Sequence, residues 1–305
     1  MPQPSVRSTL KPTFTASRKP VQPAHGIRLS KRVAELVACS RADAERYIEG
    51  GWVRVNGEVI ELPGHRVDQE KIALDPHATL LAQPSITIVL HKPPDFDANV
   101  HNAGLRPALQ LLTAAHHAST DKSGTRMLKQ HFVDLMSVTP IETGASGLLV
   151  FTKDWTVQRK LVEDAARVEH EVIVDVRGDV TERALHYLNK SQVIDDRAML
   201  PAKVSVTHQS EALAGDGYNA HTAHNAHNPG SAHSARSGHN SHNSHNPVVT
   251  GLRFAIKGCY PGQIKQMCAH VGLQVIGMKR IRVGRVMLSN LPQGQWRYVT
   301  ALEKF

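Results

Sequence analysis

The sequence predicts an α+β protein with two domains, a small helical unit followed by a larger domain with a mixed, mainly antiparallel sheet. Three observations support this prediction. The 305 residues are enough for two domains with their own hydrophobic cores. Residues 26–75 have a helix–helix–hairpin pattern, and strand-like runs with interspersed helices fill residues 86–305. Residues 76–85 between these regions are expected to form a linker.

The first 25 residues are expected to form a disordered basic tail. They are rich in Pro, Ser, Thr and basic residues, and they cannot bury enough apolar surface to offset their ordering entropy. Residues 1–34 contain seven Lys or Arg and no Asp or Glu. A transit peptide is the alternative interpretation, although the prolines disfavour the amphipathic helix that such a peptide forms.

Two short helices are predicted at the start of the small unit. Ser30 is expected to cap the first helix, whose apolar face carries Val33, Leu36 and Val37. The run Ser40-Arg41-Ala42-Asp43 is a capping-box pattern and predicts a second helix. A helix needs such a side-chain acceptor because its first N–H groups have no partner within the helix.

A hairpin is predicted directly after the second helix. Gly50-Gly51 ends that helix, and the alternating run at residues 52–60 turns at Asn56-Gly57. The unit resembles an S4 RNA-binding domain in this layout and in three segments of sequence. These segments are R-L-S-K at 28–31, S-R-A-D-A at 40–44 and G-G-W-V-R-V-N-G at 50–57. The resemblance implies RNA binding by this unit.

The positive charge of the chain indicates a polyanionic partner, with nucleic acid favoured over membrane. The formal net charge is +9 and the pI is about 9.6. Phosphate contacts from the small unit would supply affinity rather than sequence reading. A solvated helix face is the alternative interpretation of the same cations. The candidate RNA-binding residues of this unit are Arg28, Lys31, Arg32, Arg41, Arg46 and Arg54.

The larger domain is expected to begin with a strand at residues 86–90. Helices are predicted at residues 105–117 and 156–167. Further strands are predicted at residues 132–138, 147–152, 170–176, 203–207, 248–256 and 281–288.

A low-complexity segment at residues 214–247 interrupts this domain. It contains almost only His, Asn, Ser, Gly and Ala, and is expected to be a disordered insertion. Its seven histidines could bind metal weakly, but their spacing is irregular and no carboxylate or Cys completes a closed site. We therefore expect no metal centre.

The segment at residues 138–154 reads V-T-P-I-E-T-G-A-S-G-L-L-V-F-T-K-D. It resembles the active-site motif of RNA pseudouridine synthases of the rRNA-modifying branch, which usually carry G-R-L-D followed by a small-residue turn and a strand. Pro140-Ile141-Glu142 stands where Arg-Leu-Asp is usual. The run H-K-P-P at 91–94 resembles the opening of the same catalytic domain, which makes Lys92 a further candidate RNA contact.

The resemblance implies the roles of the candidate catalytic residues. Glu142 aligns with the catalytic aspartate, and Lys265 would be the cation that orients it. His170 aligns with a tyrosine that stacks on the base, although a surface strand residue is an equal alternative. Gln263 falls in the third motif, P-G-Q-I-K-Q-M at 261–267, as a candidate RNA contact. The scheme needs no metal or organic cofactor.

Two main hypotheses follow. The first is an active pseudouridine synthase that acts on structured RNA, most naturally ribosomal RNA. The second is an RNA-binding pseudo-enzyme, for example in ribosome assembly, because Glu adds a methylene that moves the reactive oxygens by about 1.5 Å. Metal storage through the His-rich segment is a remote third. We expect a cytoplasmic monomer without membrane segment or obligate protein partner, with three cysteines too scattered for a disulfide framework.

Overall fold

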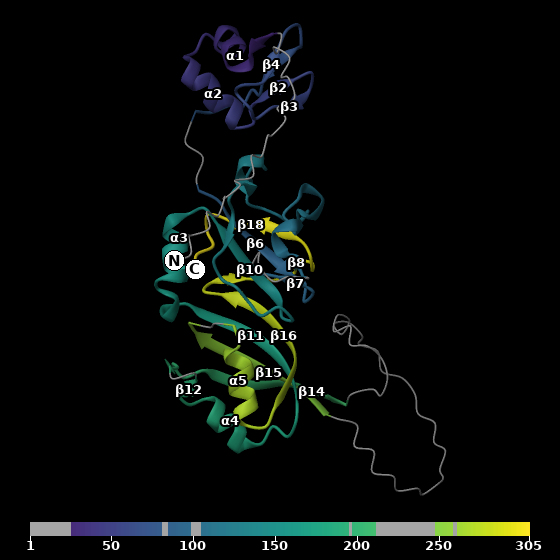
Figure 1. Ribbon diagram of the computed structural model, residues 1–305, viewed down its shortest axis with the longest axis vertical. Coiled ribbons are helices and arrows are strands. Elements are labelled where there is room, and N and C mark those ends of the chain that lie inside the picture. Colours follow the sequence, from purple (N-terminus) through teal and green to yellow (C-terminus); the bar gives the residue numbers. More distant parts are fainter. Residues whose placement is uncertain (1–25, 81–84, 99–104, 195–196, 212–247, 259–260) are drawn as a thin grey trace, which may run out of the picture. The chain divides into compact units, whose positions relative to one another are not determined.

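The computed structural model describes residues 26–80, 85–98, 105–194, 197–211, 248–258 and 261–305 (Figure 1). The chain divides into two compact units, with the division between Gln83 and Pro84. The expected basic tail and the expected His-rich insertion both lie outside the described residues.

The first unit packs two helices on a small sheet. Helices α1 (Leu29–Val37) and α2 (Arg41–Glu49) contact each other. The sheet has the order β3 (Glu58–Val59), β2 (Val53–Val55) and β5 (Ile72–Leu74), and β1 (Ile27–Arg28) pairs separately with β4 (Arg66–Val67). The core of this unit consists of Leu29, Val33, Ala44, Ile48, Val53, Val55 and Val67.

The turn signals of this unit are confirmed, except for one cap. The Ser40 hydroxyl accepts a hydrogen bond from the Asp43 N–H at 3.1 Å, and Asn56 and Gly57 both have positive φ in the hairpin turn. Ser30 was the wrong cap. It lies buried inside α1, and extended Arg28 precedes the helix. Because Arg28 pairs with Arg66 in the β1–β4 ladder, the chain stays extended up to that residue.

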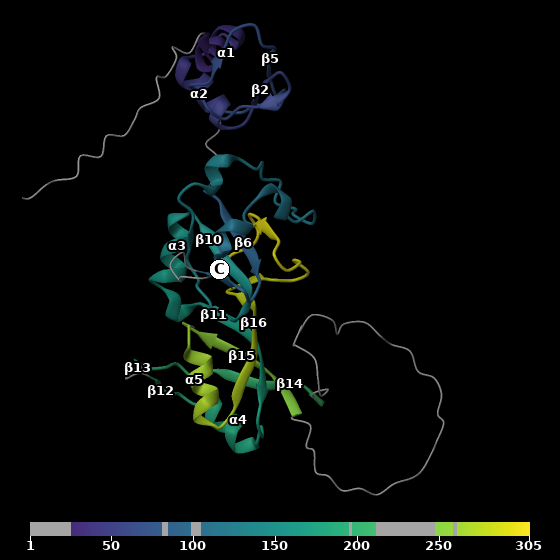
Figure 2. The same ribbon diagram turned by 45° about the vertical axis from the view of Figure 1, so that its right-hand side comes forward.

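The second unit is built on one large sheet, which Figures 1 and 2 show in two views. Every strand pair in it is antiparallel except β10–β16, which confirms the mixed, mainly antiparallel sheet. Short β9 (Met136–Ser137) pairs with β10, and β17 (Val286–Met287) pairs with β16. The main strand order is β14 (Lys203–Glu211), β15 (Val248–Lys257), β11 (Glu169–Arg177), β16 (Gln274–Val283), β10 (Ser146–Thr152), β6 (Thr87–Lys92) and β18 (Trp296–Tyr298).

The parallel pair β10–β16 joins the two halves of this sheet. Its register covers only Ser146 opposite Lys279 and Gly147 opposite Arg280. Gly147 has φ +110°, and a Cβ atom there would lie 2.2 Å from the Arg280 carbonyl oxygen. Only glycine allows this backbone approach, so the close contact between the halves depends on the residue type at position 147.

Three α-helices pack on the sheet of the second unit. Helix α3 (Trp155–Val162) inserts Leu161 among residues of β10, and the 3₁₀ turn η4 (Ala165–Arg167) follows it. Helices α4 (Glu182–Leu188) and α5 (Gln263–His270) cover the apolar residues of β11 and β15. The helix predicted at residues 156–167 therefore corresponds to α3 and η4, whereas α4 and α5 were not predicted.

The helix predicted at residues 105–117 was wrong. The segment contains β8 (Arg106–Pro107), which pairs with β7 (Phe96–Asp97), and the 3₁₀ turns η1 (Ala108–Leu111) and η2 (Ala114–His116). Proline at 107 has no N–H to donate, and extended Thr113 separates the two turns. The Trp296 indole donates to the Thr113 carbonyl at 2.8 Å, so contacts with β18 override the helical pattern.

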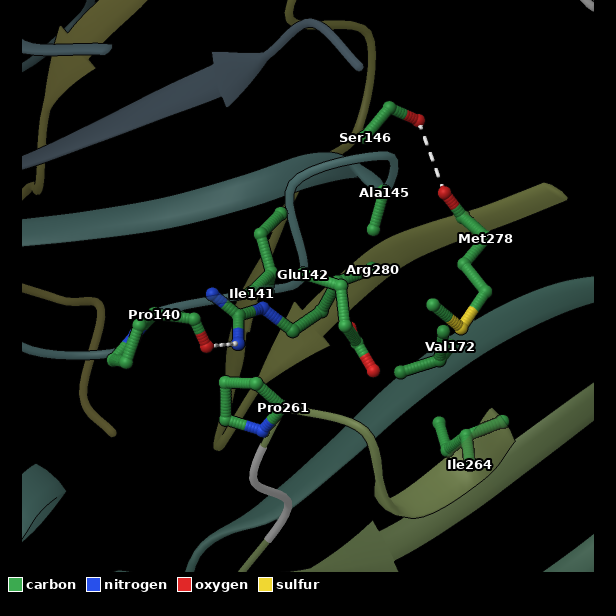
Figure 3. Close-up of a pocket in the computed structure, with 10 residues that line it drawn as sticks. All are labelled: Pro140, Ile141, Glu142, Ala145, Ser146, Val172, Pro261, Ile264, Met278 and Arg280. Atoms are coloured by element: carbon green, nitrogen blue, oxygen red, sulfur yellow. Dashed lines mark hydrogen bonds between the residues drawn. The ribbon is translucent and has the colours of Figure 1, made fainter. Parts of the chain in front are cut away.

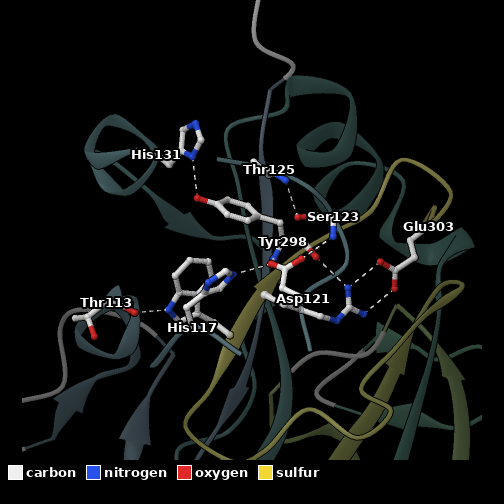
Figure 4. A network of polar contacts seen from close by, with 10 residues as sticks. Thr113, His117, Asp121, Ser123, Thr125, His131, Tyr298 and Glu303 are labelled. Carbon is white, nitrogen blue, oxygen red and sulfur yellow. Dashed lines mark hydrogen bonds and ion pairs between the residues drawn. The ribbon is translucent and has the colours of Figure 1, made fainter. Parts of the chain in front are cut away.

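A polar network attaches the segment at residues 117–131 to β18 (Figure 4). The His117 ring lies 2.8 Å from the Asp121 carboxylate, which also accepts the backbone N–H of Tyr298 at 2.9 Å. The Tyr298 hydroxyl lies 2.8 Å from Nδ1 of His131, whose 3₁₀ turn η3 spans Lys129–Phe132. These contacts satisfy polar groups that would otherwise be buried without partners.

A further short pair, β12 (Val193–Ile194) and β13 (Arg197–Ala198), lies outside the main sheet.

Substitution of Gly147 by Ala is expected to destabilise the protein by at least about 2 kcal/mol, because Ala would combine a positive φ with a backbone clash. Gly144 is the matched control, since φ there is not positive and a Cβ would meet nothing within 4 Å. Gly144→Ala should change the free energy of unfolding by less than about 0.5 kcal/mol. Urea denaturation measures both values, and equal midpoints for the two variants would contradict this account of the β10–β16 junction.

Candidate active site

Glu142 lies in the turn that leads into β10. The Ala145 N–H donates to the Glu142 carbonyl at 2.9 Å, which closes the turn. The Glu142 carboxylate accepts the backbone N–H of Gly262 at 2.8 Å, directly before α5. One side chain thus connects two segments that are 120 residues apart in the sequence.

A small pocket surrounds the Glu142 side chain (Figure 3). Its free space is about 10 Å³, which is room for about one water molecule. The walls come from the Glu142 turn, β11, β16 and the start of α5. Most of the lining is apolar, and Glu142 and Arg280 are its charged members. The lining residues are Pro140, Ile141, Glu142, Ala145, Ser146, Val172, Pro261, Ile264, Met278 and Arg280.

Arg280 holds the Glu142 turn against the sheet. Its side chain is buried in β16, and its Nε donates to the Leu148 carbonyl at 2.8 Å. The guanidinium also donates to the Thr139 carbonyl, to the Thr139 hydroxyl at 3.1 Å and to the Pro140 carbonyl at 3.4 Å. Sequence reasoning missed Arg280. The signal was strand alternation, which puts residue 280 on the same face as buried Met278.

Lys92 is buried against the Glu142 turn. Its ammonium donates to the carbonyls of Phe96 at 2.6 Å, Pro93 at 2.9 Å and Thr143 at 3.1 Å. Burial, with a smaller contribution from Arg280, lowers the pKa of Lys92 to about 8, although Asp97, Asp95 and Glu142 oppose the shift. The expectation of an RNA contact at Lys92 is corrected, because the side chain is 0% exposed and occupied by carbonyl acceptors.

His170 is buried in β11, two residues from Val172 of the pocket and on the same face of the sheet. Burial lowers the pKa of His170 to about 3, and repulsion from Arg280 and Arg282 adds to this shift. The imidazole is therefore neutral at physiological pH. This placement differs from the alternative of a surface strand residue.

The two candidate residues of the third motif, Lys265 and Gln263, do not line the Glu142 pocket. Lys265 is exposed on α5, and within the described part of the chain it forms no ion pair with Glu142. Gln263 is only 1% exposed, so its side chain is not available on the surface for RNA in this conformation. The charged groups gathered at the pocket are Glu142, Arg280 and, below the turn, Lys92.

The six cations expected to bind RNA in the first unit are all exposed: Arg28, Lys31, Arg32, Arg41, Arg46 and Arg54. Three of them make surface ion pairs within one helix, namely Arg32 with Glu35, Arg41 with Glu45 and Arg46 with Asp43. Such pairs contribute at most about 1 kcal/mol, so phosphates can displace the carboxylates.

The described residues contain neither a metal-binding cluster nor a membrane-spanning helix. No group of three or more His, Cys, Asp or Glu side chains has an arrangement that could hold a metal ion. None of the described helices combines the length and apolar character needed to span a membrane.

Comparison with known proteins gave matches to both units. The S4 domain model matches residues 27–72. The chain is 28% identical to ribosomal large subunit pseudouridine synthase B of Pseudomonas aeruginosa over 276 residues, which cover 89% of this chain and 59% of that relative. It therefore spans about three fifths of that relative's length. It is 22% identical to an uncharacterized RNA pseudouridine synthase of Aquifex aeolicus, covering 91% of this chain and 94% of that protein. A crystal structure of a pseudouridylate synthase aligns with a TM-score of 0.48 and 18% identity, covering 90% of this chain and 96% of that one.

The buried His170 predicts a specific loss of stability in acid. Its folded pKa lies below the unfolded value of about 6.5, so below that pH the unfolded chain binds a proton that the folded chain excludes. Stability from this residue is complete above about pH 6.5 and falls by up to about 1.4 kcal/mol per pH unit as the pH decreases toward about 3.

Urea denaturation from pH 7 to pH 4 of the wild type and of His170→Phe measures this loss. The wild type should lose stability relative to the variant as the pH decreases, because only the wild type has this imidazole to protonate. Parallel stability curves for the two proteins would show that His170 is not held neutral by burial.

Proposed function

We propose that the chain is an RNA pseudouridine synthase with an N-terminal S4 domain and that it isomerises a uridine of ribosomal RNA to pseudouridine, which its similarity to such enzymes supports. The observation that carries this proposal is the Glu142 carboxylate at an apolar pocket, on a turn that Arg280 fixes through its carbonyls. The S4 unit, with its six exposed cations, would dock the structured RNA through phosphates.

The reaction breaks the N1–C1′ bond of uridine, turns the base and forms a C5–C1′ bond. The target base must leave its stack and enter the pocket. Glu142 would act there as nucleophile or base, and the apolar walls would exclude water and contact the face of the base. No atom is added or lost, and this scheme requires no cofactor.

The pocket must widen before it can hold a base, since it has room for about one water molecule. The hydrogen bond from the Gly262 N–H to Glu142 joins the two sides of the pocket. We infer that substrate entry breaks this contact and frees the carboxylate. His170 would approach the base only after the same opening, whereas exposed Lys265 suits a phosphate contact at the rim better than a contact with Glu142.

An RNA-binding pseudo-enzyme is the second candidate. Two observations favour it. Glu142 is one methylene longer than the usual aspartate, and its carboxylate is already occupied by the Gly262 N–H. If the enzyme cannot open this contact, the protein would bind RNA without turnover.

The purified protein should convert uridine in deproteinised ribosomal RNA from cells that lack the gene, at a site that is modified in cells that have it. Glu142→Gln should lower the rate by about 10³-fold or more, because the amide cannot act as nucleophile or base. Affinity for RNA should stay within about twofold. Pseudouridine mapping measures the product, and filter binding measures the affinity.

Glu182→Gln is the matched control, since Glu182 is exposed in the first turn of α4 and does not line the pocket. It should leave both rate and affinity unchanged. Tight RNA binding with no pseudouridine formed by the wild type would select the pseudo-enzyme. Turnover that appears only in Glu142→Asp would identify the extra methylene as the cause.

A further inference from the structure

Trp155 is exposed where the fold gives no reason for a large aromatic residue. It opens α3 and has 63% of its surface accessible. The helix packs on the sheet through Leu161 and partly through Val157, and Trp155 belongs to no apolar cluster of the described residues. Exposing an indole of this size forfeits a large burial energy, so a stable isolated domain gains nothing from it.

Trp155 lines a groove between α3 and η4. The other lining residues are Thr156, Arg159, Lys160, Asp164 and Arg167. Arg159 and Arg167 have 63% and 86% of their side chains exposed, and Lys160 is also exposed. The groove thus combines one aromatic face with three cations and a single carboxylate.

The acidic neighbours do not fix these cations. Arg159 lies 3.4 Å from Glu163, and Arg167 lies 3.9 Å from Asp164, in exposed pairs that contribute little. Lys160 forms no ion pair with any residue that the structure describes. A phosphate that approaches the groove would meet one unpaired cation and two that can exchange their partners.

We propose that this groove is a second RNA-binding surface, on which an unpaired base stacks on Trp155 while Arg159, Lys160 and Arg167 contact the adjoining phosphates. The proposal rests on the proposed RNA-binding function but concerns a different site. An aromatic face flanked by cations is the recurrent way to hold single-stranded nucleic acid, because every base has a π-face and every nucleotide a phosphate.

The groove is separate from the Glu142 pocket. The Glu142 turn enters β10 at Ser146, and α3 begins three residues after β10 ends at Thr152. The seven-residue strand separates the two sites by roughly 20 Å. One RNA that reached both sites would have a flipped base in the pocket and an unpaired strand several nucleotides away on α3.

Fluorescence anisotropy with the full-length protein tests the stacking contact. The probes are a fluorescein-labelled 12-nucleotide oligouridylate and a 12-base-pair RNA duplex. Trp155→Ala should weaken oligouridylate binding by about 5- to 100-fold, and duplex binding by less than about twofold, because paired bases cannot stack on the indole. Trp155→Phe should restore most of the affinity. Tyr187→Ala removes an exposed aromatic from α4 and should change neither affinity.

A matched pair of lysine substitutions tests the contribution of charge to oligouridylate binding. Lys160→Glu should weaken oligouridylate binding and reduce the slope of log affinity against log salt, by about 1 to 2 between 50 and 200 mM salt. Lys190→Glu makes the same charge change at an exposed site after α4 and should have a much smaller effect. Photo-crosslinking with a 4-thiouridine oligonucleotide should label the tryptic peptide Asp154–Arg159.

Unchanged oligouridylate affinity in Trp155→Ala, with no crosslink in Asp154–Arg159, would overturn the second surface and leave Trp155 to a protein partner. The proposed function would then still stand, because the pocket and the S4 unit do not depend on α3. Absence of binding to either RNA by the wild type would overturn both proposals together.

Discussion

The buried Arg280 guanidinium is the interaction on which the rest of the second unit depends. It lies where the two halves of the large sheet meet, in the parallel pair β10–β16, and donates to carbonyls on both sides of the Glu142 turn. A buried charge without partners costs several kcal/mol, so the carbonyls of Thr139, Pro140 and Leu148 must stay in place around it. The Arg280 hydrogen bonds that join the two halves of the sheet therefore also fix the position and direction of the Glu142 turn. Glycine at 147 completes this arrangement, because any side chain there would collide with the backbone of Arg280.

The site is unusual in its charge. Two buried cations, Arg280 and Lys92, lie around one partly exposed carboxylate, and the neighbouring His170 is kept neutral. Burial lowers the pKa values of both Lys92 and His170, and each is further lowered by Arg280. A single guanidinium therefore positions the turn and also adds to the lowering of two neighbouring pKa values, which burial dominates.

Local signals predicted much of the fold, and tertiary contacts account for what they missed. The Ser40 cap, the Asn56-Gly57 hairpin and the strand at 147–152 are confirmed, because each depends on residues close in sequence. The predicted helix at 105–117 failed because contacts with β18, nearly two hundred residues later, decide that segment. The candidate site residues show the same difference between local signals and tertiary contacts. Glu142 was found from a local motif, whereas Arg280 acts on carbonyls about 140 residues away and Lys92 is buried by a turn about 50 residues later.

The geometry around Glu142 shows what changes when glutamate replaces the usual aspartate. A shorter side chain on the same turn would end about 1.5 Å sooner and would not span the 2.8 Å hydrogen bond to the Gly262 N–H without moving the backbone. Arg280 and Lys92 hold that backbone, so the turn cannot shift freely to compensate. Glutamate therefore gives this chain a carboxylate that can close its own pocket. In the proposed reaction, the hydrogen bond from the Gly262 N–H, directly before α5, would have to open, and its strength would add to the barrier. In this chain, the residue that would do the chemistry and the residue that closes the pocket are the same.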